Sequence, residues 1–170
     1  HNCPMPHNIT CVELHADEWA RLRDIRLKAL IDSPHAYGGT YENESAFDED
    51  RWRIEFLKQT YVISSVDGVD AAMMYVENLQ GDFGATCWVG GCWSDPDFRG
   101  VGLMRAMFEF LDKHADSRDW LVQGLGVWTD NGLAISAYEK LGFVEMGGPQ
   151  PSTHQPGKFY QHMIRKAITA

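Results

Sequence analysis

The sequence predicts an α+β protein, a three-layer fold in which a mixed, mostly antiparallel sheet of about seven strands is flanked by about four helices. Three observations predict this class. Segments rich in β-forming residues follow one another at 61–66, 69–79 and 85–93, as in an antiparallel meander. Apolar residues recur at helical spacing over 17–30 and 48–59. A glycine-rich turn then leads from the third strand segment into another amphipathic helix.

The composition is that of one domain. The chain has 170 residues, of which 44% are apolar and 12% aromatic, enough to bury a sizeable core. We expect a single domain over residues 8–170 and a disordered or cloning-derived N-terminus over residues 1–7. The formal charge of −9, from 15 basic and 24 acidic residues, argues against nucleic acid or an anionic membrane as partner. With no long apolar run and no signal peptide, a cytoplasmic location is predicted.

The cysteines show no pattern of a metal site. Cys3, Cys11, Cys87 and Cys92 form no C-x-x-C pair and have no histidine at zinc-type spacing. We therefore expect reduced thiols and no metal. A metal site formed by His1, Cys3 and His7 is the alternative to a disordered tail.

The first half of the chain supplies a strand, two helices and the meander. Residues 8–14 form the first expected strand, and the helix over 17–30 points Trp19, Leu22, Ile25, Ala29 and Leu30 inward. Residues 33–41 contain proline and paired glycines, which predicts a loop. The helix over 48–59 offers Trp52, Ile54, Phe56 and Leu57 to the core. Asp67-Gly68 is typical of a tight hairpin between the next two strands.

The second half alternates helices and strands. Val101, Met104, Met107, Phe108 and Leu111 recur at helical spacing after the glycine-rich turn. A strand is expected at 120–128, and two more at 143–146 and 158–168 on either side of a loop at 147–151.

The glycine-rich turn is the strongest chemical signal. Asp95-Pro96-Asp97 ends the preceding strand, and two glycines lead into the helix. A helix start leaves several backbone N–H groups unpaired, with the positive end of the helix dipole behind them, so the turn favours an anion such as a phosphate. The P-loop and dinucleotide-binding templates do not match, because the former needs Lys-Ser or Lys-Thr and the latter three glycines.

The run Arg99-Gly100-Val101-Gly102-Leu103-Met104 resembles the pyrophosphate-binding motif of the GNAT superfamily of acetyl-CoA-dependent N-acyltransferases. Met104 stands where that family usually has glycine or alanine. Residues 125–143 resemble the second GNAT signature, a strand, Asn131, a short helix carrying Tyr138, and the exit Gly142-Phe143. The order of the expected elements is similar to the GNAT arrangement over most of the chain.

The resemblance implies acetyl-CoA as co-substrate and an N-acetyltransferase acting directly on a primary amine. The main chain of Cys92, Trp93 and Ser94 would bind the pantetheine arm. The residues implied at the phosphates are Arg99, Gly100, Val101, Gly102, Leu103, Met104 and Arg105. Asn131 would bind CoA or cap its helix, since Asn is a favoured N-cap.

Catalysis of this kind requires an acid for the departing thiolate and a base for the amine. Tyr138 matches the family tyrosine near the CoA sulfur and is the expected acid. Segment 85–93 carries no carboxylate, although many family members have a Glu there. Glu77, on the neighbouring strand, is the best substitute, with His35, Asp95 and a water chain as alternatives.

The sequence says least about the acceptor amine. By resemblance, Tyr37, Tyr41 and Trp52 lie on the substrate side. Acidic residues from Glu42 to Asp50 could attract a cationic amine, or form only a solvated surface. The expected partner is a small-molecule amine or a peptide amine, and a homodimer is left open. A non-catalytic acyl-CoA-binding module is the alternative function.

Overall fold

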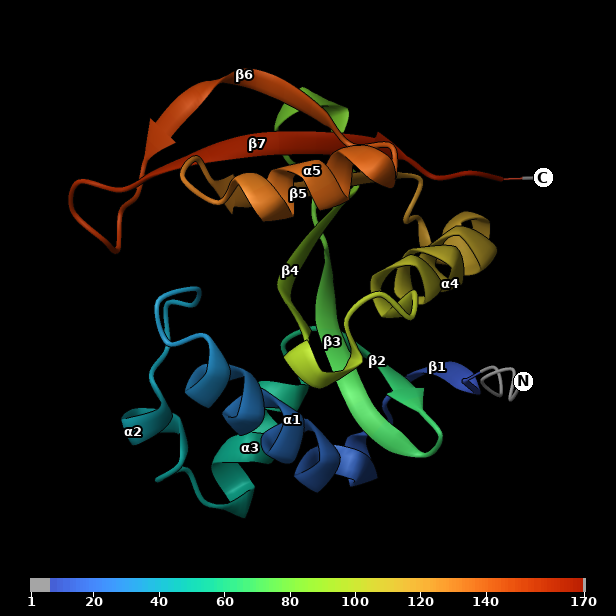
Figure 1. Ribbon diagram of the computed structural model, residues 1–170, viewed down its shortest axis with the longest axis vertical. Coiled ribbons are helices and arrows are strands. Elements are labelled where there is room, and N and C mark those ends of the chain that lie inside the picture. Colours follow the sequence, from blue (N-terminus) through green and yellow to red (C-terminus); the bar gives the residue numbers. More distant parts are fainter. Residues whose placement is uncertain (1–6, 170) are drawn as a thin grey trace, which may run out of the picture. The chain divides into compact units, whose positions relative to one another are not determined.

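A computed structural model describes residues 7–169 and confirms the α+β class (Figure 1). The elements are β1 (Ile9–Glu13), α1 (Trp19–Asp32), α2 (Tyr41–Glu44), α3 (Glu49–Phe56), β2 (Thr60–Val66), β3 (Val69–Asn78), β4 (Cys87–Ser94), α4 (Leu103–Arg118), β5 (Val122–Trp128), α5 (Gly132–Lys140), β6 (Val144–Pro151) and β7 (Phe159–Lys166). The seven strands are hydrogen-bonded in the order β1-β2-β3-β4-β5-β7-β6. The expected N-terminal tail, with His1 and Cys3, lies outside the described residues except for His7.

The described chain forms two compact units. The first comprises the chain up to Tyr75 together with Gly91–Phe110, and the second comprises Val76–Gly90 with the chain from Leu111 on. The elements β3, β4 and α4 each contribute residues to both units.

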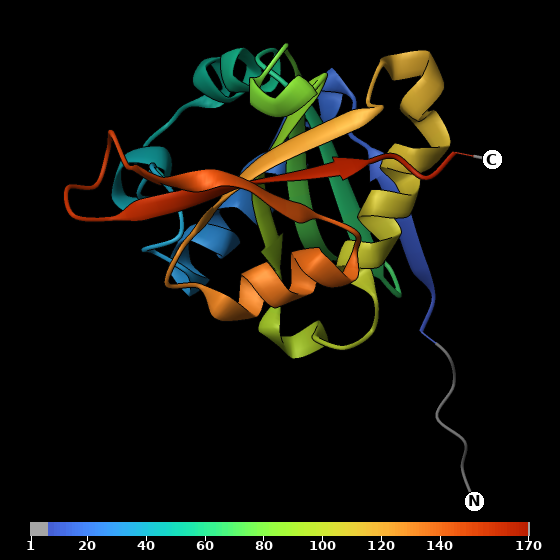
Figure 2. The same cartoon turned by 90° about the horizontal axis from the view of Figure 1, so that it is seen from above.

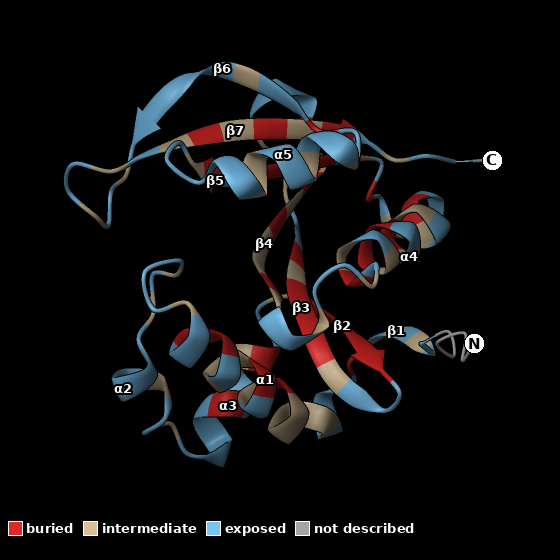
Figure 3. Cartoon of the chain, viewed as in Figure 1, coloured by how far each residue is buried: buried red, intermediate tan, exposed pale blue. Residues whose placement is uncertain are grey.

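The core of the first unit lies between its helices and strands. α1 and α3 run side by side, and their buried residues face β2 and β3 (Figures 1 and 3). On α1, Leu22, Ile25 and Ala29 recur at helical spacing and are buried together with Phe56 of α3. Met73 and Trp93 close this core from the strands. Each helix therefore buries one stripe and leaves its other face in water.

Two of the core residues expected on α3 are in fact exposed. Ile54 is 56% exposed and Leu57 is 79% exposed, whereas Trp52 and Phe56 are buried. The buried pair is four residues apart and so lies on one face of the helix. Ile54 falls on the opposite side, and Leu57 is already the residue after the last helical turn.

Local turn signals in this unit are partly confirmed. Asp67 and Gly68 both have positive φ, +49° and +84°, as the predicted two-residue hairpin requires. The predicted loop at 33–41 is interrupted at its end, because Tyr41 begins the one-turn helix α2. Thr40 caps this helix by accepting a hydrogen bond from the Asn43 amide at 3.2 Å.

In the second unit, β7 pairs with β5 and β6 in antiparallel register (Figure 2). The predicted loop at 147–151 is wrong, since β6 continues to Pro151 across a register shift between Met146 and Gln150. The Gln161 side chain donates to the carbonyl oxygens of Met146 and Gly147, both at 3.0 Å. These bonds give hydrogen-bond partners to two carbonyl oxygens at the point where the pairing of β6 with β7 is irregular.

A buried ion pair organises the rest of the second unit. The Arg165 side chain on β7 is 5% exposed, and its two terminal nitrogens each lie 2.7 Å from an oxygen of Asp112 on α4. Its Nε donates to the Leu141 carbonyl at 2.7 Å, and Nη1 to Gln123 Oε1 at 3.1 Å. One guanidinium thereby joins two strands, a helix and the end of α5.

Candidate functional site

The glycine-rich turn presents backbone to solvent. Gly100 and Gly102 have φ of +82° and +91°, a conformation that residues with a Cβ rarely adopt. No atom lies within 4 Å of the position that a Cβ would take at either glycine. The Ala106 amide donates to the Gly102 carbonyl at 3.0 Å, so the amides of Leu103 to Arg105 lie ahead of the first amide that donates within the helix. These amides make an open cradle suited to an anion.

Asp95 holds the start of this turn. Its Oδ1 accepts a hydrogen bond from the Asp97 amide at 2.9 Å, and its Oδ2 lies 2.7 Å from Lys28 Nζ of α1. Burial works to raise the pKa of this carboxyl, but Lys28 and the Asp97 amide together keep it below the ordinary value. A carboxylate with a lowered pKa that is already paired with Lys28 is a poor proton acceptor. This argues against Asp95 as the general base.

The β4 segment next to the turn is fastened to α1 and to the loop that follows α1. Trp93 is buried, and its Nε1 donates to Asp32 Oδ2 at 2.9 Å. The Tyr37 hydroxyl donates to the Cys92 carbonyl at 3.1 Å. Burial raises the pKa of Tyr37, which keeps the phenol protonated as this donor. Tyr37 therefore supports the β4 backbone where pantetheine binding is expected.

A glycine interrupts β4 just before these residues. Gly91 has φ of +60°, and a Cβ there would lie 3.0 Å from Cδ1 of the Tyr75 ring. The ring of Tyr75 thus packs directly on the β4 backbone, which only glycine allows. Earlier in the strand, Cys87 and Trp88 pair in parallel with β5.

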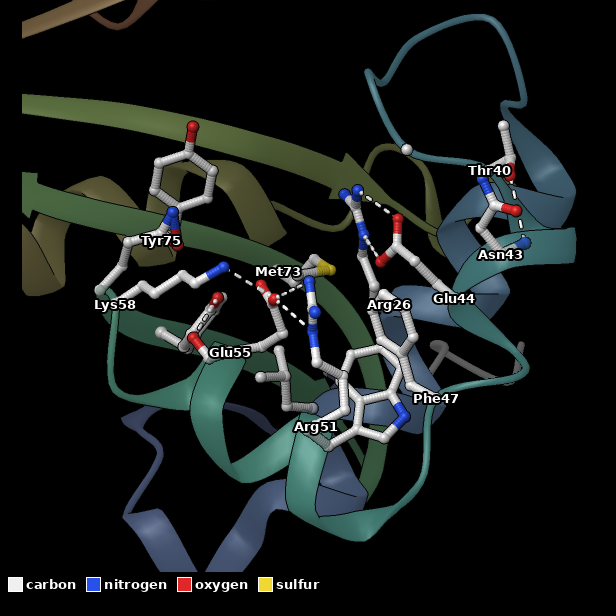
Figure 4. Close-up of a pocket in the computed structure, with 15 residues that line it drawn as sticks. Arg26, Thr40, Asn43, Glu44, Phe47, Arg51, Glu55, Lys58, Met73 and Tyr75 are labelled. Carbon is white, nitrogen blue, oxygen red and sulfur yellow. Dashed lines mark hydrogen bonds and ion pairs between the residues drawn. The ribbon is translucent and has the colours of Figure 1, made fainter.

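A cavity of about 380 Å³ lies in the first unit, beside this part of β4 (Figure 4). Its lining residues come from α1, the segment containing α2, α3 and the strands β2 and β3. They are Leu22, Arg26, Gly39, Thr40, Asn43, Glu44, Phe47, Arg51, Trp52, Glu55, Lys58, Gln59, Tyr61, Met73 and Tyr75. Of the three residues expected on the substrate side, Trp52 lines this cavity, Tyr37 supports β4, and Tyr41 is 45% exposed.

Charged side chains enter the cavity as two groups (Figure 4). Arg26 and Glu44 form a two-point ion pair at 2.9 and 3.1 Å. Arg51 and Lys58 both approach a single oxygen, Oε1 of Glu55, each at 2.8 Å. Burial works to raise the pKa of Glu55, and the two cations keep it below the ordinary value. Glu55 is therefore a stable anion shared by two cations.

The sequence alone does not single out these cavity residues, apart from Trp52 and, within the acidic run, Glu44. One signal was present: Arg26 follows Leu22 by four residues and so falls on the buried stripe of α1. A charged residue in that position implies a partner inside the fold. The partner, Glu44, lies in the segment expected to be irregular.

Most of the acidic run has structural partners. Glu44 pairs with Arg26, Asp48 caps α3 by accepting from the Arg51 amide at 2.9 Å, and Glu49 pairs with Arg53. These carboxylates stabilise helix starts and loops.

The remaining predicted residues belong to the second unit. Asn131 caps α5, its side chain accepting from the Ala134 amide at 3.2 Å. Tyr138 on α5 is half-buried, and its ring packs edge-on against Phe143 with centroids 5.6 Å apart. Glu77 is exposed near the end of β3.

Within residues 7–169, no group of three or more His, Cys, Asp or Glu is placed to hold a metal ion. None of the described helices is long and apolar enough to cross a bilayer. Burial raises the pKa of the Cys11 and Cys87 thiols to about 11 and about 12. Both are therefore neutral near pH 7.

Comparison with known proteins agrees with this architecture. None of the curated proteins matches the chain closely enough in sequence to count as a relative. Among solved structures, a GNAT-family acetyltransferase from Streptococcus pneumoniae superposes with a TM-score of 0.74 at 15% identity, covering 95% of this chain and 100% of that one. The ribosomal-protein-S18-alanine N-acetyltransferase from Escherichia coli gives 0.64 at 21% identity and 96% coverage of both chains. The yncA protein from Salmonella typhimurium, solved with its cofactor acetyl-CoA, gives 0.69 at 17% identity and 94% coverage of both.

The sequence profile of the acetyltransferase (GNAT) family matches residues 17–143, which include the glycine-rich turn, Asn131 and Tyr138. The chain therefore belongs to the GNAT acetyltransferase family.

Proposed function

We propose that this acetyltransferase transfers the acetyl group of acetyl-CoA directly to the primary amine of a small molecule or a peptide. The observation that carries the proposal is the open backbone cradle at Gly100–Gly102 ahead of α4. Family membership supports the transfer chemistry, and the similar yncA structure contains acetyl-CoA. A cytoplasmic location and a homodimer are further parts of the proposal, the latter to be tested by light scattering.

The residues of the turn fit the pyrophosphate group of acetyl-CoA. When bound, acetyl-CoA would supply an acetyl group activated as a thioester. The amides of Leu103, Met104 and Arg105 would donate to phosphate oxygens, and the open space at both glycines admits them. Arg99 and Arg105 are exposed and would add positive charge on an otherwise acidic protein. The backbone of Cys92–Ser94, held by Tyr37 and Asp32, would bind the pantetheine arm as an added strand.

The chain's own groups would then move two protons. An amine with a pKa of about 10.4 is protonated near pH 7, so a base must take its proton, and we assign this task to Glu77. The phenol of Tyr138 would return a proton to the departing thiolate. A backbone N–H at Trp93 or Ser94 would donate to the carbonyl oxygen as negative charge develops there.

Two variants separate binding from turnover. Gly102→Glu places a bulky negative charge in the cradle, so we expect calorimetry to show at least about a hundredfold weaker CoA binding, several charge-assisted bonds being lost. Tyr138→Phe should retain CoA affinity and lower kcat by about a hundredfold or more. The control is Gly157→Glu, where φ is +82° and the space is equally open.

Unchanged CoA affinity in Gly102→Glu would show that the phosphates of CoA do not bind at this turn. Full activity of Tyr138→Phe would show that Tyr138 is not the proton donor. If the protein bound acetyl-CoA but released no thiol with any primary amine or N-terminal peptide, the proposed acceptor class would be wrong. Peptides beginning with alanine belong in that panel, because the similar Escherichia coli enzyme acts on a ribosomal protein.

A further inference from the structure

We propose that the cavity of the first unit selects an acceptor amine that also carries a carboxylate, as an amino acid does. This inference rests on the proposed function, since it names the class of amine that the enzyme would use.

The cavity lies beside the part of β4 where the thioester end of the co-substrate is expected. Tyr75 lines the cavity and packs on Gly91. Arg26, which also lines it, stacks its guanidinium on the Tyr37 ring at 4.8 Å, and Tyr37 donates to the Cys92 carbonyl. Two independent contacts therefore connect the cavity wall to Gly91 and Cys92. Tyr75 and Arg26 therefore mark the side of the cavity that is nearest to β4, and the amine of an acceptor would have to lie on this side.

The side chains that line the cavity carry one more positive than negative charge. Among the described residues the lining contains three cations, Arg26, Arg51 and Lys58, and two anions, Glu44 and Glu55. Arg26 and Glu44 neutralise each other in their two-point pair. Arg51 and Lys58 share Glu55 alone, so one cation has no matching anion in the lining.

The donors at this group also exceed what Glu55 accepts. An ammonium carries three N–H donors and a guanidinium five, whereas the contacts to Glu55 converge on Oε1. The side chains of Arg51 and Lys58 are about half exposed, 51% and 52%, so a ligand can approach them. A ligand carboxylate would supply both the missing charge and the missing acceptors.

The other walls suit an apolar body. Phe47, Trp52, Tyr61 and Tyr75 contribute aromatic surface to the lining. The cavity thus combines a cationic group, Arg51 and Lys58, with aromatic walls and a side toward β4. This combination matches a carboxylate, a side chain and an amine on one small molecule.

The test compares amines that differ only in the carboxylate: phenylalanine with phenethylamine, histidine with histamine, and lysine with cadaverine. We expect the carboxylated member of at least one pair to bind about tenfold to a hundredfold more tightly by calorimetry, with and without CoA present, because charge-assisted bonds to the carboxylate are lost in its partner. Thiol release with acetyl-CoA should show the same preference in kcat/KM.

Matched variants on α3 and just after its end test whether Arg51 and Lys58 cause the preference. Arg51→Gln and Lys58→Gln each remove the excess charge and should lower the preference at least about fivefold, while Lys58→Arg should retain it. Arg53→Gln removes an arginine from α3 that pairs with Glu49 and is not among the lining residues, so it should leave the preference unchanged. Glu55→Gln should raise the preference, because it leaves two cations for the ligand.

The outcomes separate the two proposals. Turnover of both members of every pair with equal kcat/KM would overturn the carboxylate inference and leave the acetyltransferase proposal standing. A preference for the decarboxylated amines would also overturn the inference, in favour of attraction by acidic groups. A preference that Arg51→Gln and Lys58→Gln do not change would place the carboxylate elsewhere and contradict the site. CoA binding by the Gly102→Glu variant is measured separately, so failure of the proposed function is recognised independently.

Discussion

At the scale of single residues, the molecule uses its charged side chains mainly as partners of one another. The cation of Arg165 is almost entirely removed from water, which is costly unless every donor finds an acceptor. Here the acceptors are Asp112, the Leu141 carbonyl and Gln123. The pair is therefore sensitive to the loss of either member.

We expect Asp112→Ala to lower the free energy of unfolding by about 3–5 kcal/mol, because it leaves a buried guanidinium without its anion. Urea denaturation followed by circular dichroism measures this change. Asp116→Ala, on the exposed face of the same helix, is the control and should change the free energy by less than about 0.5 kcal/mol. Equal effects of the two substitutions would show that the Arg165 pair contributes no more than a surface charge.

At the scale of elements, β4 departs from a regular strand for a packing reason. Its Gly91 has a positive φ and lies against the Tyr75 ring, so it needs both the conformational freedom and the missing side chain of glycine. Gly68, in the β2–β3 hairpin, needs only the first of these, because its surroundings are open.

Gly68→Ala should therefore cost only the strain of a left-handed residue, about 1–2 kcal/mol. Gly91→Ala should cost at least about 1 kcal/mol more, because Tyr75 must also move. Thermal and urea unfolding of the two variants make the comparison. In a Tyr75→Ala background the extra cost of Gly91→Ala should disappear, and its persistence would show that another contact causes it.

At the scale of the whole molecule, the net charge of −9 acts on any charged ligand that approaches. The field attracts a cationic amine and exerts almost no net force on a zwitterion. The selection proposed for the cavity therefore opposes the attraction exerted by the whole protein. Salt separates these two effects, because it screens long-range attraction more than contacts inside a cavity.

We expect kcat/KM for phenethylamine to fall several-fold as ionic strength rises from about 20 to about 200 mM, whereas the value for phenylalanine should change less than about twofold. Steady-state thiol release at several salt concentrations tests this. Equal salt dependence of the two amines would contradict the separation of long-range attraction from local recognition.

The sequence predicts most of the elements because their signals are local. Helical spacing identified α1 and α4, Asp67-Gly68 identified its hairpin, and Asn131 identified the start of α5. The errors have local causes too: α3 is shorter than expected, and β6 continues through a segment whose glycines and proline suggest a loop. Here pairing with β7 overrides the propensity of the residues.

The sequence by itself determined the order of the strands and of the longer helices, the glycine turn ahead of α4 and the family, since each depends on residues close together in the chain. Only the tertiary structure decided that Arg26 pairs with Glu44, that Tyr37 supports Cys92, and that two cations share Glu55. Tyr37 and Cys92 are 55 residues apart. Periodicity shows which side of an element is buried, but not which side chain from another element meets it there. For this reason the turn could be found from the sequence, and the charge balance of the cavity could not.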